Sequence, residues 1–247
     1  MDKARLLTRG TARDDEIVFS TVSQCFAPID KQGWEELVDT VLWSDFIDAS
    51  RRLLQENATS GDKTLFRRME SRCPLQDYLS DKEVSALFAP PSWEEKQSFA
   101  ARHFTGGLPS SALPVESLYL PSGKPEDRLS TQGNGRLPGV YEGEPARYMR
   151  DLVARMGFIV PSRFSDCPDH LSVELDLLAV MLRSDMKHQA DCFFKERFAW
   201  LSDYRLKLLS LPSNEGVGFY VGLVDVIMGI WLLRCASDEV SHSQSTV

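Results

Sequence analysis

The sequence predicts an all-α fold, a single-domain helical bundle with a long irregular connection in its middle. Apolar residues recur at helical spacing through most of the chain, and strand-like alternation is scarce. With 247 residues, 43% of them hydrophobic, the chain can bury a sizeable core. One domain is expected over 1–247, with a helical N-terminal part over 1–104, an irregular connection over 105–145, a helical C-terminal part over 146–236 and a loose tail over 237–247.

The N-terminal part begins with two predicted helices. The first covers about 14–26, and the second, stronger one runs from about Trp34 to Gln55. The apolar stripe of the second helix consists of Leu37, Val41, Phe46 and Leu53. Such a stripe is typical of a helix that packs against a core.

Two shorter helices are predicted for the segments PLQDYLSDKEVSALFA and SWEEKQSFAARHF. In the second segment, Ser92 precedes Glu94 and Glu95. A serine at the N-cap and carboxylates in the first turn both favour the start of a helix.

The connection is dense in glycine, proline and serine, and LPVESLYL is its one ordered-looking island. A connection of this length without a regular pattern is typical of a functional or a disordered segment. Helix returns at about 145–157, where Gly157 is a suitable stop, and three further helices are predicted at about 168–186, 188–210 and 215–235.

The most apolar segment, VGFYVGLVDVIMGIWLLRCA, contains Asp225 and three glycines. We interpret it as a buried helix and not as a membrane span, although its length is borderline for spanning. The N-terminus has no apolar run that could form a signal-peptide core, so no export is expected.

The charge and the cysteines restrict the classes of partner. A formal net charge of −8 repels phosphate backbones, so nucleic acid is not expected and a basic peptide is a more natural partner. Five separated cysteines, without a CxxC pair, favour neither a disulfide framework nor a zinc site, and indicate a reducing compartment. The four histidines show no HxxxH or HExxH spacing, so no metal is expected.

The stretch DCPDH, before the apolar run LSVELDLLAVML, is the main candidate site. As structure alone, Asp166 caps free amides, Pro168 occupies a first helical turn, and Asp169 lies at the positive end of the helix dipole. In the helix that follows, Glu174 is expected to face solvent. As an enzyme site, His170 would be a general base oriented by one of the aspartates, but the chain lacks a GxSxG elbow or a phosphate-cradling glycine loop. The glycines of TQGNGRLPG do not link a strand to a helix, so they are better read as a flexible loop.

Aromatic residues are concentrated in two predicted helices. They are Trp93, Phe99 and Phe104 in one, and Phe193, Phe194, Phe198 and Trp200 in the other. Such stripes are usually core, and a minority line a groove for a partner helix or an extended peptide.

The order of these segments resembles the TorD/DmsD family of redox-enzyme maturation chaperones. Its first motif corresponds to Pro114, Glu116, Ser117 and Tyr119, and its second to Asp166, Pro168, Asp169, His170, Glu174 and Leu175. The resemblance covers roughly Phe99 to Tyr204. The chain departs from the family at Arg197 and Phe198, where a His-Leu pair is common, with Trp200 one place early, and in a longer segment over 121–143.

The resemblance implies an all-helical cytoplasmic chaperone without catalysis or a cofactor. It implies binding of the twin-arginine leader and the apo-form of a molybdenum-cofactor oxidoreductase, of the dimethyl-sulfoxide-reductase superfamily, with export delayed until the cofactor is inserted. The client-binding residues that it implies are Asp169, His170, Pro168, Asp166, Pro114, Glu116, Ser117, Tyr119, Phe99 and Phe104. The carboxylate and the imidazole of the helix start would be exposed, and carboxylates such as Asp169 and Glu116 would pair with the leader's arginines. The aromatic residues would form a groove for its apolar stretch.

Two other classes of function remain open at this point. One is a nucleotide-binding or hydrolytic enzyme that uses Asp169 and His170, and the other is a structural helical subunit of a complex.

Overall fold

The computed structural model describes residues 3–58, 88–105, 110–119, 143–212 and 216–244, with the backbone alone described at 3–11, 55–58 and 237–244. The helix predicted for PLQDYLSDKEVSALFA falls almost wholly outside the described residues. So does most of the segment over 121–143.

The described chain is helical, as the sequence predicts. The helices are α1 (Lys3–Phe26), α2 (Lys31–Leu37), α3 (Thr40–Ala58), α7 (Trp93–His103), α8 (Glu144–Arg155), α9 (Leu171–Arg183), α10 (Lys187–Arg197), α11 (Leu201–Leu209) and α12 (Val217–Gln244), with 3-10 turns η1 (Glu116–Leu118), η4 (Ser162–Phe164) and η5 (Phe198–Trp200). Within the described residues no strand forms, and the only β-type pairing is an isolated bridge between Val115 and His170. The all-α prediction is confirmed.

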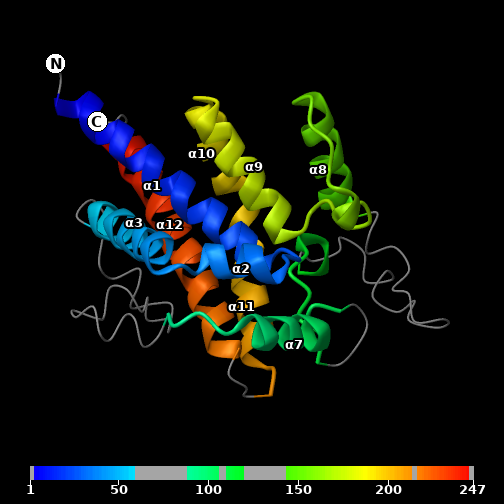
Figure 1. The fold of residues 1–247 in the computed structure, drawn as a ribbon. Helices are drawn as coiled ribbons and strands as arrows, with labels where there is room; N and C mark the ends of the chain where they lie inside the picture. Colours follow the sequence, from blue (N-terminus) through cyan, green and yellow to red (C-terminus); the bar gives the residue numbers. More distant parts are fainter. Residues whose placement is uncertain (1–2, 59–87, 106–109, 120–142, 213–215, 245–247) are drawn as a thin grey trace.

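The helices form one bundle around an aromatic core. Helix α1 packs against α9 and α3, α12 packs against α3, α10 and α11, and α2 contacts α3 and α7. In Figure 1, α8 stands at the edge of the bundle opposite α3, and α7 crosses below α2 and α9. In the core, the rings of Phe99 and Tyr220 stack with centroids 4.5 Å apart, and Phe26 contacts Tyr220 at 5.2 Å.

The helix predicted from Trp34 to Gln55 is two helices, because the chain turns between α2 and α3. The Asp30 side chain caps α2 by accepting from the Gly33 amide at 2.8 Å, and Asp39 accepts from the Val41 amide at 3.3 Å before α3. Because of this turn, the side chains of Trp34 on α2 and Trp43 on α3 both lie in the core. Apolar spacing alone does not show it, since the stripe continues across the break.

The segment predicted as one helix over 188–210 is also interrupted. Turn η5 tightens the chain between α10 and α11, and it places both Phe198 and Trp200 in the core, two residues apart. Gly157 has φ 78° and ends α8 as predicted, since a residue with a Cβ is strained in that left-handed conformation. Helix α12 continues to Gln244, beyond the start of the polar tail over 237–247.

Helix α12 is the one described helix that is long and apolar enough to cross a membrane, over Val217–Ala236. Within the bundle 72% of its most apolar window is buried, so the packing of a core helix accounts for its composition. Asp225, which interrupts the apolar run, forms an ion pair with Arg205 at 2.5 Å.

Candidate functional site

The two motifs meet where η1 packs against the start of α9, and we call this place the junction (residues 114–117 and 169–171). The amide of Glu116 donates to the carbonyl of Asp169 at 3.0 Å, and the amide of Leu171 donates to the carbonyl of Pro114 at 2.9 Å. These backbone bonds surround the bridge between Val115 and His170. The junction is therefore a short strand-like pairing inside a helical protein.

Asp169 connects the two motifs through its side chain. Its Oδ2 accepts from the Ser117 amide at 2.9 Å and from the Ser117 hydroxyl, and the residue is fully buried. Its other oxygen, Oδ1, has no hydrogen-bond partner among the described residues. An aspartate held in this way fixes the conformation of η1 and is not available for a partner at the surface.

His170 is the N-cap of α9. Its Nδ1 accepts from the Ser172 amide at 3.1 Å, and its ring packs against Phe164 with centroids 4.7 Å apart. Burial, and secondarily the charge of Arg163, lowers the pKa of His170 to about 3. The imidazole is therefore neutral near pH 7, with Nδ1 occupied by a structural hydrogen bond. Helix α9 begins at Leu171, so the prediction of Asp166 as the capping residue is wrong.

Two carboxylates and one guanidinium form the interior of the site. Arg197, at the end of α10, donates from Nη2 to Glu116 Oε2 at 2.5 Å, its Nη1 lies 3.6 Å from Glu144, and its guanidinium lies 4.7 Å from the Tyr148 ring centroid. Arg197 thus connects η1 with α8. It stands where the family commonly has a histidine.

Glu174 lies beside this ion pair, fully buried on the second turn of α9. Burial, followed by the neighbouring charge of Glu116, raises the pKa of Glu174 well above its ordinary value. Neither carboxyl oxygen of Glu174 has a hydrogen-bond partner among the described residues. The prediction that Glu174 faces solvent is wrong, because η1 and α10 cover that side of α9.

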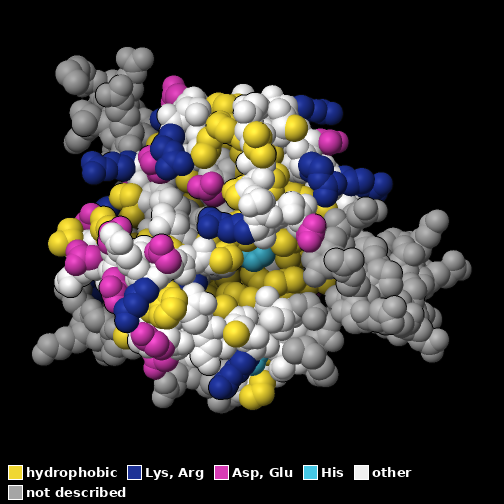
Figure 2. All heavy atoms as spheres, turned by 45° about the vertical axis from the view of Figure 1, so that its right-hand side comes forward, with side chains coloured by type: hydrophobic (Ala, Val, Ile, Leu, Met, Phe, Trp, Pro, Cys, Tyr) yellow, Lys and Arg dark blue, Asp and Glu magenta, His cyan; other side chains and the backbone are white. Residues whose placement is uncertain are grey.

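The aromatic candidates belong to one cluster. Tyr119 stacks on Trp200 at 5.6 Å and contacts Tyr204 at 5.3 Å, and its hydroxyl donates to the carbonyl of Leu113 at 3.1 Å. Phe104, at the end of α7, reaches the same cluster through Phe26. Figure 2 shows a hollow in the middle of this face whose floor consists largely of hydrophobic side chains.

The structure brings the ten predicted site residues together but buries most of them. The buried residues are Pro114, Glu116, Pro168, Asp169, His170 and Phe99. Phe104, Ser117 and Tyr119 are half-buried, and Asp166 is exposed. The expectation that a carboxylate and an imidazole are exposed at the helix start is therefore wrong. Turn η1 folds over the start of α9 and covers both side chains.

Sequence reasoning missed the counter-charge of the site. Arg197 is separated from Glu116 by 81 positions, and only its place in the family pattern drew attention to it. A second missed contact is that of Ser23 on α1, whose hydroxyl donates to the carbonyl of Ser172 at 2.7 Å and anchors the first turn of α9. In the part of the chain that the structure describes, no group of histidine, cysteine and carboxylate side chains could hold a metal ion.

The helical bundle and the paired motifs define a chaperone of the redox-enzyme maturation class. A family model described as "Nitrate reductase delta subunit" matches residues 73–210, more than half of the chain, and the chain belongs to this family. The family consists of molybdoenzyme maturation chaperones and agrees with the resemblance to TorD/DmsD. No curated protein and no solved structure shows significant similarity to the chain.

Proposed function

We propose that this protein binds the twin-arginine leader and the apo-form of a molybdenum-cofactor oxidoreductase of the dimethyl-sulfoxide-reductase superfamily. It assists insertion of the cofactor in the cytoplasm and delays export of the client until insertion is complete. It carries no cofactor and catalyses no reaction. The observation that supports this proposal best is that the family match contains both motifs and that the two motifs meet in one network at the junction.

In this proposal the buried and the exposed site residues have different roles. Asp169, Glu116 and His170 fix the shape of the junction, since they are buried and already hydrogen-bonded. The client contacts the half-buried aromatic residues Phe104 and Tyr119. Burial of apolar surface contributes most of the affinity in a contact of this kind.

The hydrolytic alternative has less support. A general base needs a free nitrogen and a pKa near the working pH, whereas Nδ1 of His170 accepts from a backbone amide and its pKa lies at about 3. Among the described residues Asp169 makes no hydrogen bond to the His170 ring: its Oδ2 accepts from Ser117 and its Oδ1 has no partner. The helix cap explains His170, and the bond to Ser117 explains Asp169.

The test is capture of the client from cells that make molybdenum oxidoreductases. We expect the tagged chain to co-purify with a leader-bearing oxidoreductase that lacks its cofactor, and we expect cells without the chaperone to accumulate inactive client. Asp166→Lys, at the exposed edge of the site, should reduce capture, whereas Asp176→Lys, an exposed aspartate on α9, should not. The proposal fails if no such client is captured and the oxidoreductases mature equally well without the protein.

A further inference from the structure

The three N-terminal helices enclose a cleft that the motifs do not include. It has a volume of about 340 Å³ and is lined by Ile17, Ser20, Thr21, Gln24, Ile29, Gly33, Glu36, Leu37, Leu42 and Asp45. We infer that this cleft, between α1, α2 and α3, binds the arginine-containing segment of the client's leader. This inference rests on the proposed function and adds a second contact to it.

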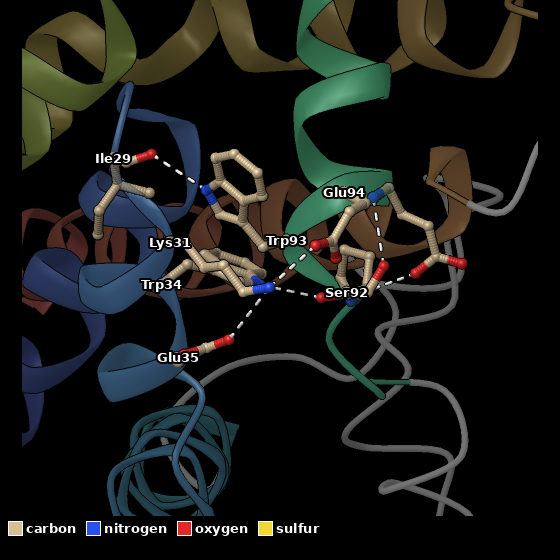
Figure 3. A network of polar contacts seen from close by, with 9 residues as sticks. Ile29, Lys31, Trp34, Glu35, Ser92, Trp93 and Glu94 are labelled. Atoms are coloured by element: carbon tan, nitrogen blue, oxygen red, sulfur yellow. Dashed lines mark hydrogen bonds and ion pairs between the residues drawn. The ribbon is translucent and has the colours of Figure 1, made fainter.

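The wall formed by α2 is held in place before any ligand arrives. The indole of Trp34 donates to the carbonyl of Pro91 at 3.0 Å. Lys31 donates to Glu94 of α7 at 3.1 Å, as Figure 3 shows. Trp93 also reaches back to the carbonyl of Ile29, at 3.5 Å. Because α2 is tied to α7 on one side, its other side presents a preformed surface, which lowers the entropic cost of binding.

The cleft has an apolar floor and an apolar rim. Ile17, Ile29 and Leu37 are buried or half-buried at its floor. At the rim, at the start of α3, the side chain of Leu42 is 53% exposed and that of its neighbour Val41 is 67% exposed. Two adjacent large hydrophobic side chains on the surface beside a cleft are typical of a contact site for a partner.

The charge around the cleft is strongly negative. Between residues 30 and 48 the chain has six carboxylates, Asp30, Glu35, Glu36, Asp39, Asp45 and Asp48, and a single cation, Lys31. That lysine is already paired with Glu94 and lies 3.9 Å from Glu35. Figure 2 shows acidic and hydrophobic side chains mixed on the side of the molecule where α2 and α3 lie. Such a surface repels phosphates and anionic membranes and attracts a basic, partly apolar segment.

A leader with paired arginines has this chemistry. A guanidinium between Glu36 and Asp45 would bond a carboxylate with two donors, while its aliphatic stem and the next apolar residues pack on Leu37 and Leu42. The carboxylates of the junction cannot take this role, since Glu116 and Asp169 are buried and bonded to Arg197 and Ser117. The cleft admits a few side chains, so it fits a peptide and not a folded domain.

The experiment measures binding of a fluorescently labelled synthetic peptide with two adjacent arginines followed by an apolar stretch. We expect Glu36→Lys with Asp45→Lys, and separately Leu42→Asp, to weaken binding by about tenfold or more, which corresponds to about 1.4 kcal/mol. The matched control is Asp151→Lys with Asp176→Lys, which makes the same change in net charge at exposed positions of α8 and α9 outside the cleft lining, and it should change affinity by less than about threefold. Circular dichroism and the melting temperature check that each variant is folded.

A second measurement locates the peptide directly. A photo-crosslinking amino acid in place of Leu42 should capture the peptide, and one in place of exposed Leu206 on α11 should not. If the peptide binds and its affinity falls only when residues of the junction are substituted, the inference about the cleft is overturned while the proposed function stands. Equal loss in the control variant, or crosslinking of Leu42 to a second copy of the chain, also overturns it. If the peptide binds no form of the protein, leader recognition itself fails.

Discussion

Ser117 and Asp169 lie 52 positions apart in the chain, and both the amide and the hydroxyl of the serine donate to one oxygen of the aspartate. Each residue belongs to a different motif of the family pattern. The serine is the middle residue of the 3-10 turn and the aspartate precedes the N-cap of α9, so the pair fixes the angle at which turn and helix meet. Their pairing explains physically why a turn with serine and a helix start with aspartate occur together in one sequence.

Removal of this aspartate should destabilise the fold. Asp169→Ala leaves the Ser117 amide without its acceptor in a buried site, and we expect a loss of about 2–4 kcal/mol in the free energy of unfolding. Asp169→Asn retains one acceptor oxygen and should lose less. Urea unfolding checks this, with exposed Asp166→Ala as the control, which should change the free energy by under about 0.5 kcal/mol. Equal stability of Asp169→Ala and wild type would contradict the role given to this bond.

Arg197 and Glu116 should behave as a coupled pair. Arg197→Met leaves Glu116 buried without its counter-charge and should cost about 3–5 kcal/mol, and Glu116→Gln should cost less. The double variant should lose less free energy of unfolding than the sum of the losses of the two single variants. A double-mutant cycle in urea measures the coupling free energy. A coupling near zero would show that the pair contributes nothing to the junction.

Glu174 should be replaceable by its neutral isostere. Burial raises the pKa of Glu174 well above its ordinary value of 4.5, so this carboxyl costs the folded state stability, and the cost grows as the pH rises above 4.5. Glu174→Gln removes the cost, because the amide is uncharged at every pH. We expect the variant to be more stable than wild type by about 1 kcal/mol at pH 8, with a smaller difference at pH 5. Thermal or urea unfolding at the two pH values measures this difference. Glu174→Ala should destabilise the protein at both pH values, because it leaves a cavity.

His170 should make the protein acid-sensitive. Its folded pKa, about 3, is below the ordinary value of 6.5, so its contribution to stability is complete above pH 6.5 and is lost as the pH falls toward 3. Between pH 7 and pH 5 the loss amounts to about 2 kcal/mol. Glu174 acts in the opposite direction, so the measurement is the difference between wild type and His170→Asn, which keeps a side-chain cap. The asparagine variant should lose less stability on acidification, and parallel pH profiles would refute this role of the histidine.

Binding of the leader should depend mainly on apolar contact. Titration by calorimetry should give a negative heat-capacity change and only moderate weakening when salt is raised from low to physiological concentration. Lysines in place of the paired arginines should weaken binding modestly, since each exposed ion pair contributes about 0–1 kcal/mol. A charge inserted into the apolar stretch should abolish binding. The reverse order would mean that electrostatic recognition dominates.

Helix ends are predicted well from the sequence where a residue type has a specific role at a helix end, such as serine at the N-cap or glycine after the last turn. Ser92 caps α7 as predicted and also forms a capping box with Glu95, and Gly157 ends α8 with a positive φ. The break between α2 and α3 was missed because Asp39 interrupts the helix without interrupting the apolar stripe. The family pattern located the site, but it could not show that the site is buried. Glu174 was assigned to solvent because a carboxylate on a helix is usually exposed, and only the distant Arg197 and Glu116 make its burial possible.

The contact between η1 and α8 holds together the two ends of the chain segment that connects them. A Cβ at Gly143 would lie 3.0 Å from the hydroxyl of Ser117, so the two ends of the segment 120–142 are held next to each other by the folded part on either side. The entropy of closing a flexible loop changes by only about 0.6 kcal/mol when its length doubles. Insertions and deletions between these anchors therefore cost the fold little.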